Sequence, residues 1–399
     1  MAKKRLQKKR EAAKASAFQA AAAKAETPKI TTKKVQPIKV ETTKTEPVKV
    51  ETKKTEPIKV ETKKVEPAKV ETQKSEAVKV ETAKVESAKV ETKKTETAKV
   101  ETTKAEPVKL ENKRDDDHIY RERLARHLDE LKWLYCELYQ DNPYVTMHLN
   151  DLLKVLKKFY DMRGDALKES DLKREKDPTW YKRNDLTGMM MYVNAFAGTL
   201  SNLESKLDYI QECNVNYLHL MPLLDSPRGR SDGGYAVADF RKVQEELGTM
   251  DDFADLTAAC HKRGINVCLD FVMNHTSEDH EWAKRARNGE KEYQDRYFFF
   301  DNYDIPSLYE QTCPEVFPTT APGNFTWLED LHKHVMTTFY PYQWDLNYRN
   351  PRVFNEMMYN FLFLANKGID IVRIDAVPYI WKELHTTCRN LPQVHTIVR

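Results

Sequence analysis

The N-terminal quarter of this 399-residue chain lacks the residues that build a hydrophobic core. Its first 110 residues contain no glycine and one aromatic residue, Phe18, and they carry 29 lysines and arginines against 16 acidic residues. Such a segment cannot bury enough apolar surface to offset the entropy that ordering the chain would cost. We therefore predict a disordered tail with two parts, a basic, alanine- and lysine-rich N-terminus (1–27) and a repeat linker (28–114).

The linker repeats every ten residues. The sequence Lys-Val-Glu-Thr begins at positions 39, 49, 59, 69, 79, 89 and 99. This period matches no solenoid unit, and the recurring prolines would break a helix. We interpret the linker as an extended, charged spacer. Its lysines invite a nucleic-acid hypothesis, but glutamate recurs at fixed positions and stacking aromatics are missing, so a solvated spacer is favoured. Residues 1–27 are the segment in which polyanion binding would have to lie.

Other absences narrow the class of protein further. No apolar run approaches the length of a membrane span, and no apolar core follows the basic start, as a secretory signal would require. We expect a cytoplasmic protein with no membrane partner. The six cysteines are scattered without a Cys-x-x-Cys motif, which favours reduced thiols. The sequence indicates no oligomeric state.

A helical pattern begins at residue 115. Leucines and tyrosines recur on one face in 124–138 and again in 149–160, before Asp177-Pro178 interrupts the periodicity. We predict a small all-α domain over 115–184 whose aromatic stripe belongs to its core.

Residues 185–399 alternate short apolar runs with amphipathic segments, the pattern of an α/β fold with parallel strands. Four such units are half of a (β/α)₈ TIM barrel, with an inserted, irregular B-type domain at about 276–341. The predicted strands are 189–194, 217–221, 267–272 and 369–375, and the predicted helices are 203–213, 251–263, 353–366 and 380–388.

The fourth strand ends in a charged pair. Arg373 and Asp375 are two residues apart in an apolar run, so both side chains leave the strand on the same face. We expect the guanidinium to lower the pKa of the carboxyl and keep it ionised. An ion pair that only caps a strand would look the same in isolation.

Polar residues also follow the second and third strands. Asp232 and Tyr235 lie in a glycine-rich turn after the second strand, and Asp270 leads into Asn274 and His275 after the third. Each cluster has an ordinary structural explanation. Three clusters at successive strand ends, where TIM barrels place their chemistry, favour a functional site.

These residues carry a resemblance to a known family. The segments Asp270–Ser277 and Gly368–Val377 resemble the first two signature regions of glycoside hydrolase family 13, the α-amylase superfamily. Within that family the chain is most similar to amylosucrase, through the helical region, the Ser-Asp-Gly-Gly-Tyr turn and Thr337–Tyr348. The resemblance covers about 115–399.

The resemblance implies a role for each matched residue, and the implied roles are as follows: Asp375 is the nucleophile, Arg373 orients it, His275 bonds the glucosyl ring, Asp232 and Tyr235 close the sugar pocket, Phe339 forms an aromatic wall, and Asp270 supports the end of the barrel. It also implies retaining α-glucosyl transfer from sucrose to an α-glucan acceptor through a covalent glucosyl-aspartate, with no cofactor and no metal.

Alternatives remain open on the sequence alone. Another family 13 enzyme, such as an α-amylase, a sucrose hydrolase or a trehalose synthase, would share these residues. A truncated, non-catalytic sugar-binding or interaction protein is the alternative from a different class. The general acid and the third carboxylate expected after later strands have no match up to Arg399. We therefore expect the chain to be a fragment of a longer polypeptide.

Overall fold

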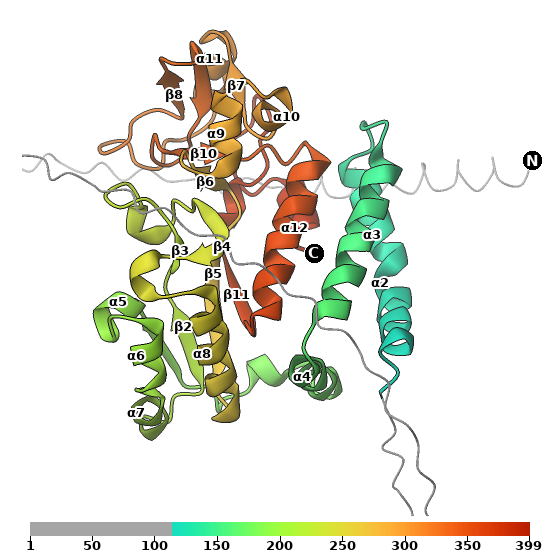
Figure 1. Ribbon diagram of the computed structural model, residues 1–399. Coiled ribbons are helices and arrows are strands. Elements are labelled where there is room, and N and C mark those ends of the chain that lie inside the picture. The colour runs from blue at the N-terminus through green and yellow to red at the C-terminus, as the bar shows by residue number, and fades with distance from the viewer. Residues whose placement is uncertain (1–113) are drawn as a thin grey trace, which may run out of the picture. The chain divides into compact units, whose positions relative to one another are not determined.

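The computed structural model describes residues 114–399, which are coloured in Figure 1. The predictions for residues 1–27 and for linker residues 28–113 lie outside the described residues.

Three helices open the described region: α2 (Asp116–Leu138), α3 (Val145–Met162) and α4 (Asp165–Lys176). The predicted apolar face of the two long helices is confirmed, since Tyr135, Leu149 and Phe159 are buried. The last of the three helices ends directly before Asp177-Pro178, because proline disfavours a helical conformation in the residue before it. A short 3-10 helix, η1 (Trp180–Lys182), leads on to the sheet.

Helices α2 and α3 are attached to α12 (Pro351–Asn366), which lies beside α3 in Figure 1. The Tyr135 hydroxyl donates to Asn355 Oδ1 at 2.9 Å, and Asn355 Nδ2 donates to the carbonyl oxygen of His148 at 2.8 Å. Asn355 is buried, so one amide of α12 fixes both N-terminal helices.

Within residues 114–399, four parallel strands form one sheet in the order β1-β2-β5-β11. They are β1 (Gly188–Met191), β2 (Tyr217–Leu220), β5 (Asn266–Val272) and β11 (Ile371–Asp375). All four lie where the sequence predicts strands. Arg373 pairs with Asp270, and Asp375 with Val272, so the polar residues of β5 and β11 come together at the carboxyl edge of the sheet.

The connections between the strands are mostly helical: α5 (Val193–Phe196), α6 (Leu200–Glu204), α7 (Leu207–Glu212) and α8 (Met250–Lys262) precede β5, and α12 precedes β11. The prediction of one continuous helix over 203–213 was wrong, since α6 and α7 are separate helices. At the break, the Ser205 hydroxyl donates to the carbonyl oxygen of Asn202 at 2.7 Å, and such local side-chain bonds compete with helical ones.

Between β2 and α8 the chain forms a small antiparallel pair, β3 (Leu224–Asp225) and β4 (Asp239–Val243), with η2 (Asp232–Gly234) between them and η3 (Glu245–Leu247) after them. This segment carries the predicted glycine-rich turn to the edge of the sheet.

The insertion after β5 is more regular than the sequence suggests. It opens and closes on an antiparallel pair, β6 (His275–Ser277) and β10 (Gln343–Asp345). Between them lie α9 (Glu281–Arg287), α10 (Lys291–Gln294), β7 (Phe299–Phe300), α11 (Asp304–Glu310), β8 (Phe325–Leu328) and β9 (Lys333–Met336). The last three strands form a sheet in the order β7-β9-β8, seen beyond the end of the main sheet in Figure 1. The prediction of an irregular insertion was therefore wrong, because strands of two to four residues are too short to show a periodicity.

The helix predicted over 380–388 is absent. The chain instead forms η4 (Val377–Tyr379), an irregular segment and α13 (Pro392–Val398). His385 and Cys388 have positive φ angles of 64° and 50°, which a right-handed helix does not allow. The side chain of Lys382 anchors this segment through a buried ion pair, which is described below with the site.

No helix among residues 114–399 is long and apolar enough to cross a membrane. The six cysteines are free thiols, four of them buried.

Candidate active site

Arg373 is the centre of a hydrogen-bonded cluster at the carboxyl edge of the sheet. Its Nη1 lies 2.7 Å from Asp375 Oδ1, 2.5 Å from Asp270 Oδ1 and 3.3 Å from the Tyr235 hydroxyl. Asp270 is buried, and its second oxygen lies 2.9 Å from His219 Nε2 on β2. The predicted orientation of the two side chains is therefore confirmed, because Arg373 and Asp375 project from the same face of β11.

Arg373 lowers the pKa of Asp375 as predicted, but the net shift of that pKa is upward. Burial raises the pKa of Asp375 above its usual value, and the nearby Arg373 charge only partly opposes that rise. The carboxylates of Asp270 and Asp232 raise the pKa of Asp375 further. A guanidinium that already serves Asp270 has less capacity left for a second acid.

Asp232 is presented by a tight turn. Asp232, Gly233 and Gly234 all have positive φ angles, of 50°, 67° and 98°. At Gly234 a Cβ atom would lie 2.8 Å from Cβ of Pro222, so only glycine fits there. Burial raises the pKa of Asp232, although a hydrogen bond from Gln343 opposes this.

His275 lies on the other side of the same cluster, held by the β6–β10 pair. Its Nε2 is 3.2 Å from the carbonyl oxygen of Tyr235 and 3.1 Å from Gln343 Nε2. Gln343 Nε2 also donates to Asp232 Oδ2 at 3.2 Å. The Phe339 ring centroid lies 5.1 Å from that of His275. Burial lowers the pKa of His275 to about 4, so the imidazole is neutral at pH 7.

All seven predicted site residues thus come together. Two hydrogen-bonded groups, one around Arg373 and one around Gln343, meet at Tyr235, whose hydroxyl faces Arg373 and whose carbonyl oxygen faces His275. Sequence reasoning missed Gln343 as a site residue. It lies inside Thr337–Tyr348, which carries part of the resemblance, but only the pairing of Gln343 with Ser277 brings it to His275.

A second cation lies behind the cluster. Lys382 Nζ is 2.7 Å from Asp345 Oδ2 and 2.8 Å from Asn274 Oδ1, and both side chains of the ion pair are fully buried. Asn274 Nδ2 in turn lies 3.3 Å from His275 Nδ1. Residues 114–399 contain no group of three or more His, Cys, Asp or Glu side chains arranged to hold a metal ion. The positively charged group beside Asn274 is the ammonium of Lys382.

The arrangement can bind and attack a neutral polyhydroxylated ligand. Asp375 supplies a carboxylate oxygen, Asp232 and His275 supply hydrogen-bonding groups, and Tyr235 and Phe339 supply aromatic surface. These are the residue types that a sugar ring requires on one side of a scissile bond.

Comparison with known proteins gives the family. The family profile described as "Alpha amylase, catalytic domain" matches residues 156–398, more than half of the chain. The chain therefore belongs to the α-amylase family, glycoside hydrolase family 13, whose members are of the glycosidase and glycosyltransferase type.

Curated relatives refine the comparison. The chain is 40% identical over 206 residues to the "Trehalose synthase/amylase TreS" of Mycolicibacterium smegmatis, covering 51% of this chain and 33% of the relative. It is 38% identical over 191 residues to "Maltase 1" of Drosophila virilis, covering 47% and 29%. The chain spans about a third of the length of these relatives. Neither is an amylosucrase, so the closer resemblance to amylosucrase remains a prediction.

Among solved structures, the trehalose-6-phosphate hydrolase of Bacillus licheniformis is similar at 28% identity, with a TM-score of 0.47 over 55% of this chain and 41% of that chain.

Proposed function

We propose that this protein transfers or hydrolyses α-linked glucosyl units by a retaining mechanism, with a glucose disaccharide such as maltose or trehalose as substrate. The observation that carries the proposal is the position of Asp375. It projects from the end of β11 into a cluster in which Arg373, Tyr235, His275 and Asp232 are linked by hydrogen bonds.

Asp375 acts as the nucleophile in this proposal. Its Oδ1 accepts a hydrogen bond from Arg373, and its side chain keeps 18% of its surface exposed. Attack of a carboxylate oxygen on the anomeric carbon forms a glycosyl ester as the bond to the leaving oxygen breaks, and that oxygen takes its proton from a general acid, which has no match up to Arg399. Attack by water or by a second sugar then restores the original stereochemistry.

Asp232 and His275 hold the glucosyl ring. The neutral imidazole can donate to or accept from a hydroxyl without adding charge, whereas the carboxylate of Asp232 accepts from hydroxyls. Tyr235 and Phe339 offer aromatic faces to the axial C–H bonds of a pyranose. Asp270 touches Arg373 and His219 and supports the position of the guanidinium.

The choice of a maltose or trehalose substrate rests on the relatives. Their printed names are trehalose synthase/amylase, trehalose synthase and maltase. The test is a product assay in which the active protein is given maltose, trehalose, sucrose or starch separately. We expect glucose or a rearranged glucose disaccharide from maltose. Consumption of sucrose alone would overturn the substrate and leave the mechanism standing.

An amylosucrase-like activity, from sucrose to an α-glucan acceptor, is the second candidate. It is supported by the helical region that forms part of the resemblance to amylosucrase. Helix α2 lies upstream of the matched residues 156–398, and both α2 and α3 are bound to α12 through Asn355. Release of fructose together with a lengthening glucan would favour this candidate. Sugar binding without turnover of any substrate would favour the non-catalytic alternative.

The proposal also concerns architecture. We infer that the four parallel strands correspond to the first four units of a (β/α)₈ barrel, that residues 115–184 form a helical domain beside it, and that residues 276–341 form a B-type inserted domain. The parallel order β1-β2-β5-β11 with helical crossovers supports this assignment. The disordered tail 1–114 remains a prediction.

A further inference from the structure

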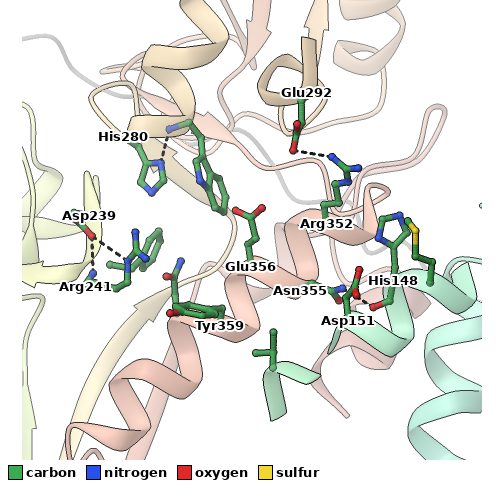
Figure 2. Close-up of a pocket in the computed structure, with 15 residues that line it drawn as sticks. His148, Asp151, Asp239, Arg241, His280, Glu292, Arg352, Asn355, Glu356 and Tyr359 are labelled. Atoms are coloured by element: carbon green, nitrogen blue, oxygen red, sulfur yellow. Dashed lines mark hydrogen bonds and ion pairs between the residues drawn. The ribbon is translucent and has the colours of Figure 1, made fainter. Parts of the chain in front are cut away.

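A cavity of about 510 Å³ lies at the junction of α3, β4, α9, α10 and α12, and none of the proposed site residues lines it. Figure 2 shows its lining side chains converging from α3, from α12, from the hairpin that precedes α8 and from the insertion. The volume is within the range of about 300–1,000 Å³ that is usual for small-molecule sites, and junctions between structural units are common places for them.

Three nearly buried polar side chains in this cavity have unused hydrogen-bonding capacity. His280 is 6% exposed, and its Nδ1 accepts from the backbone N–H of Trp282 at 3.1 Å. Burial lowers the pKa of His280 to about 3, so the neutral ring must carry its proton on Nε2. Among residues 114–399, no hydrogen bond is formed by His280 Nε2, by the Asn360 amide or by the His148 ring. Asn360 and His148 are 6% and 7% exposed.

The charged side chains around the cavity are already paired. Arg352 Nη1 lies 2.8 Å from Glu292 Oε1, and Asp151 Oδ1 lies 2.8 Å from Lys154 Nζ. Glu356 forms an ion pair with the buried Arg296. The cavity therefore offers many donors and acceptors but no unbalanced charge. Such a lining disfavours a phosphate or a metal cation and suits a neutral ligand that both donates and accepts.

Aromatic surface completes the lining. Trp282, Tyr359 and Phe240 line the cavity together with the polar groups. The guanidinium of Arg296 lies 4.6 Å from the Trp282 ring centroid and holds the indole in place. A rigid aromatic wall beside hydroxyl-binding groups is the combination that recognises the apolar and polar faces of a sugar.

We propose that this cavity binds a neutral saccharide, a glucose oligomer of two or three units, at a site separate from the Asp375 cluster. The choice of glucose as the sugar rests on the proposed function, whereas the neutral, hydroxyl-rich chemistry comes from the lining itself. Occupation of this site would retain an α-glucan on the protein while its end is processed elsewhere.

Maltotriose is the probe, and titration calorimetry on the full chain is the measurement. Asn360→Leu keeps the number and branching of the side-chain heavy atoms and removes the amide, so we expect maltotriose affinity to fall at least tenfold while the unfolding midpoint stays level or rises. Asp151→Asn removes a charged acceptor from the cavity and should weaken binding about threefold. If Asn360→Leu does not fold, Asp151→Asn decides, because its side chain is 49% exposed and is not needed for packing.

Matched controls locate the effect. Asp161 lies on α3, as Asp151 does. It is 52% exposed and pairs with Lys157 at 2.6 Å, but it lies outside the cavity. Asp161→Asn should bind maltotriose as the unaltered protein does. Asp232→Asn weakens binding only at the proposed reaction site, so the part of the maltotriose binding that depends on Asn360 should persist in it.

Some results would overturn the proposal. Unchanged affinity in both cavity variants would do so, and so would complete loss of binding in Asp232→Asn or the absence of any maltotriose binding at millimolar concentration. Lack of turnover with cavity binding intact would contradict only the proposed function.

Discussion

Two pairs of a cation and a carboxylate lie at the same end of the sheet, and they differ in how completely the protein encloses them. Lys382 and Asp345 are 2.7 Å apart, and both side chains are fully buried. Arg373 and Asp375 are also 2.7 Å apart, but they keep 47% and 18% of their side-chain surface exposed.

This difference in burial distinguishes an ion pair that supports the structure from one that can take part in a reaction. In the enclosed pair, the Lys382 ammonium also contacts Asn274, and Asp345 also accepts from the Thr338 backbone N–H at 3.0 Å. In the open pair, Arg373 holds only one oxygen of Asp375, and no hydrogen bond from residues 114–399 reaches the other. A carboxylate with a free, accessible oxygen can attack a substrate, whereas a fully bonded one can only hold structure.

The largest expected effect is on turnover at the open pair. Asp375→Asn is nearly isosteric but not nucleophilic, so kcat should fall by about 10⁴-fold or more in the active protein. Burial already raises the pKa of Asp375, so a neutral amide should change the unfolding free energy by less than about 1 kcal/mol. Single-turnover kinetics and urea unfolding measure the two effects. Retained turnover would remove Asp375 from the reaction.

The enclosed pair should show the opposite pattern. Lys382→Met leaves Asp345 charged and unpaired in the interior, and we expect it to lower the unfolding free energy by about 3–5 kcal/mol. Adding Asp345→Asn should recover much of that loss, because the charge is then gone. Asp375→Asn is the control at the open pair and should cost far less stability, since it leaves no buried charge without its partner. Equal losses in Lys382→Met and Asp375→Asn would break the distinction.

His275 should make stability depend on pH. Its folded-state pKa is about 4 against an ordinary value of 6.5, so the folded state favours the neutral ring. The contribution is therefore complete above pH 6.5 and is lost as pH falls toward 4, by roughly 3 kcal/mol at most. In urea unfolding at pH 7 and pH 4, His275→Asn should lose less stability on acidification than the unaltered protein. His280, whose pKa is also lowered, stays the same in both proteins and cancels in the comparison.

Gln343 should affect substrate binding more than turnover. Its amide joins Asp232 to His275, so Gln343→Leu should raise KM about tenfold, equivalent to roughly 1.4 kcal/mol, and change kcat little. Gln343→Glu is the informative companion, because it keeps the shape but places a like charge beside Asp232. A fall in kcat as large as the fall in kcat/KM would contradict a binding role.

The sequence predicts the strands and the proximity of the candidate site residues for a physical reason. Alternation on β11 and the shared direction of parallel strands are enough to place Arg373, Asp375 and Asp270 together. The same reasoning fails for Gln343 and Lys382. Gln343 reaches His275 only through the β6–β10 pairing. Lys382 was predicted to lie in a helix, but that helix is absent and the lysine side chain forms an ion pair with Asp345. The raised pKa of Asp375 could not be foreseen, since it comes mainly from burial of the carboxyl, which the sequence does not reveal.

The smallest expected effect is at the residue after the nucleophile. Ala376 has a φ of 52°, a left-handed conformation that costs an alanine about 1–2 kcal/mol. Ala376→Gly relieves that cost but increases the entropy of the unfolded chain, so we expect a net stabilisation below about 1 kcal/mol in urea unfolding. A clear loss of stability would show that the alanine methyl group supports the end of β11.

The central claim is that an oxygen of Asp375 forms a covalent bond to the anomeric carbon of glucose. A fluorinated glucosyl donor slows the breakdown of such an ester and traps it, and peptide mass mapping then locates the label. We predict one added glucosyl mass on the peptide that contains Asp375, and none in Asp375→Asn. A label on any other residue, or an active protein that turns over substrate without labelling, would contradict the account.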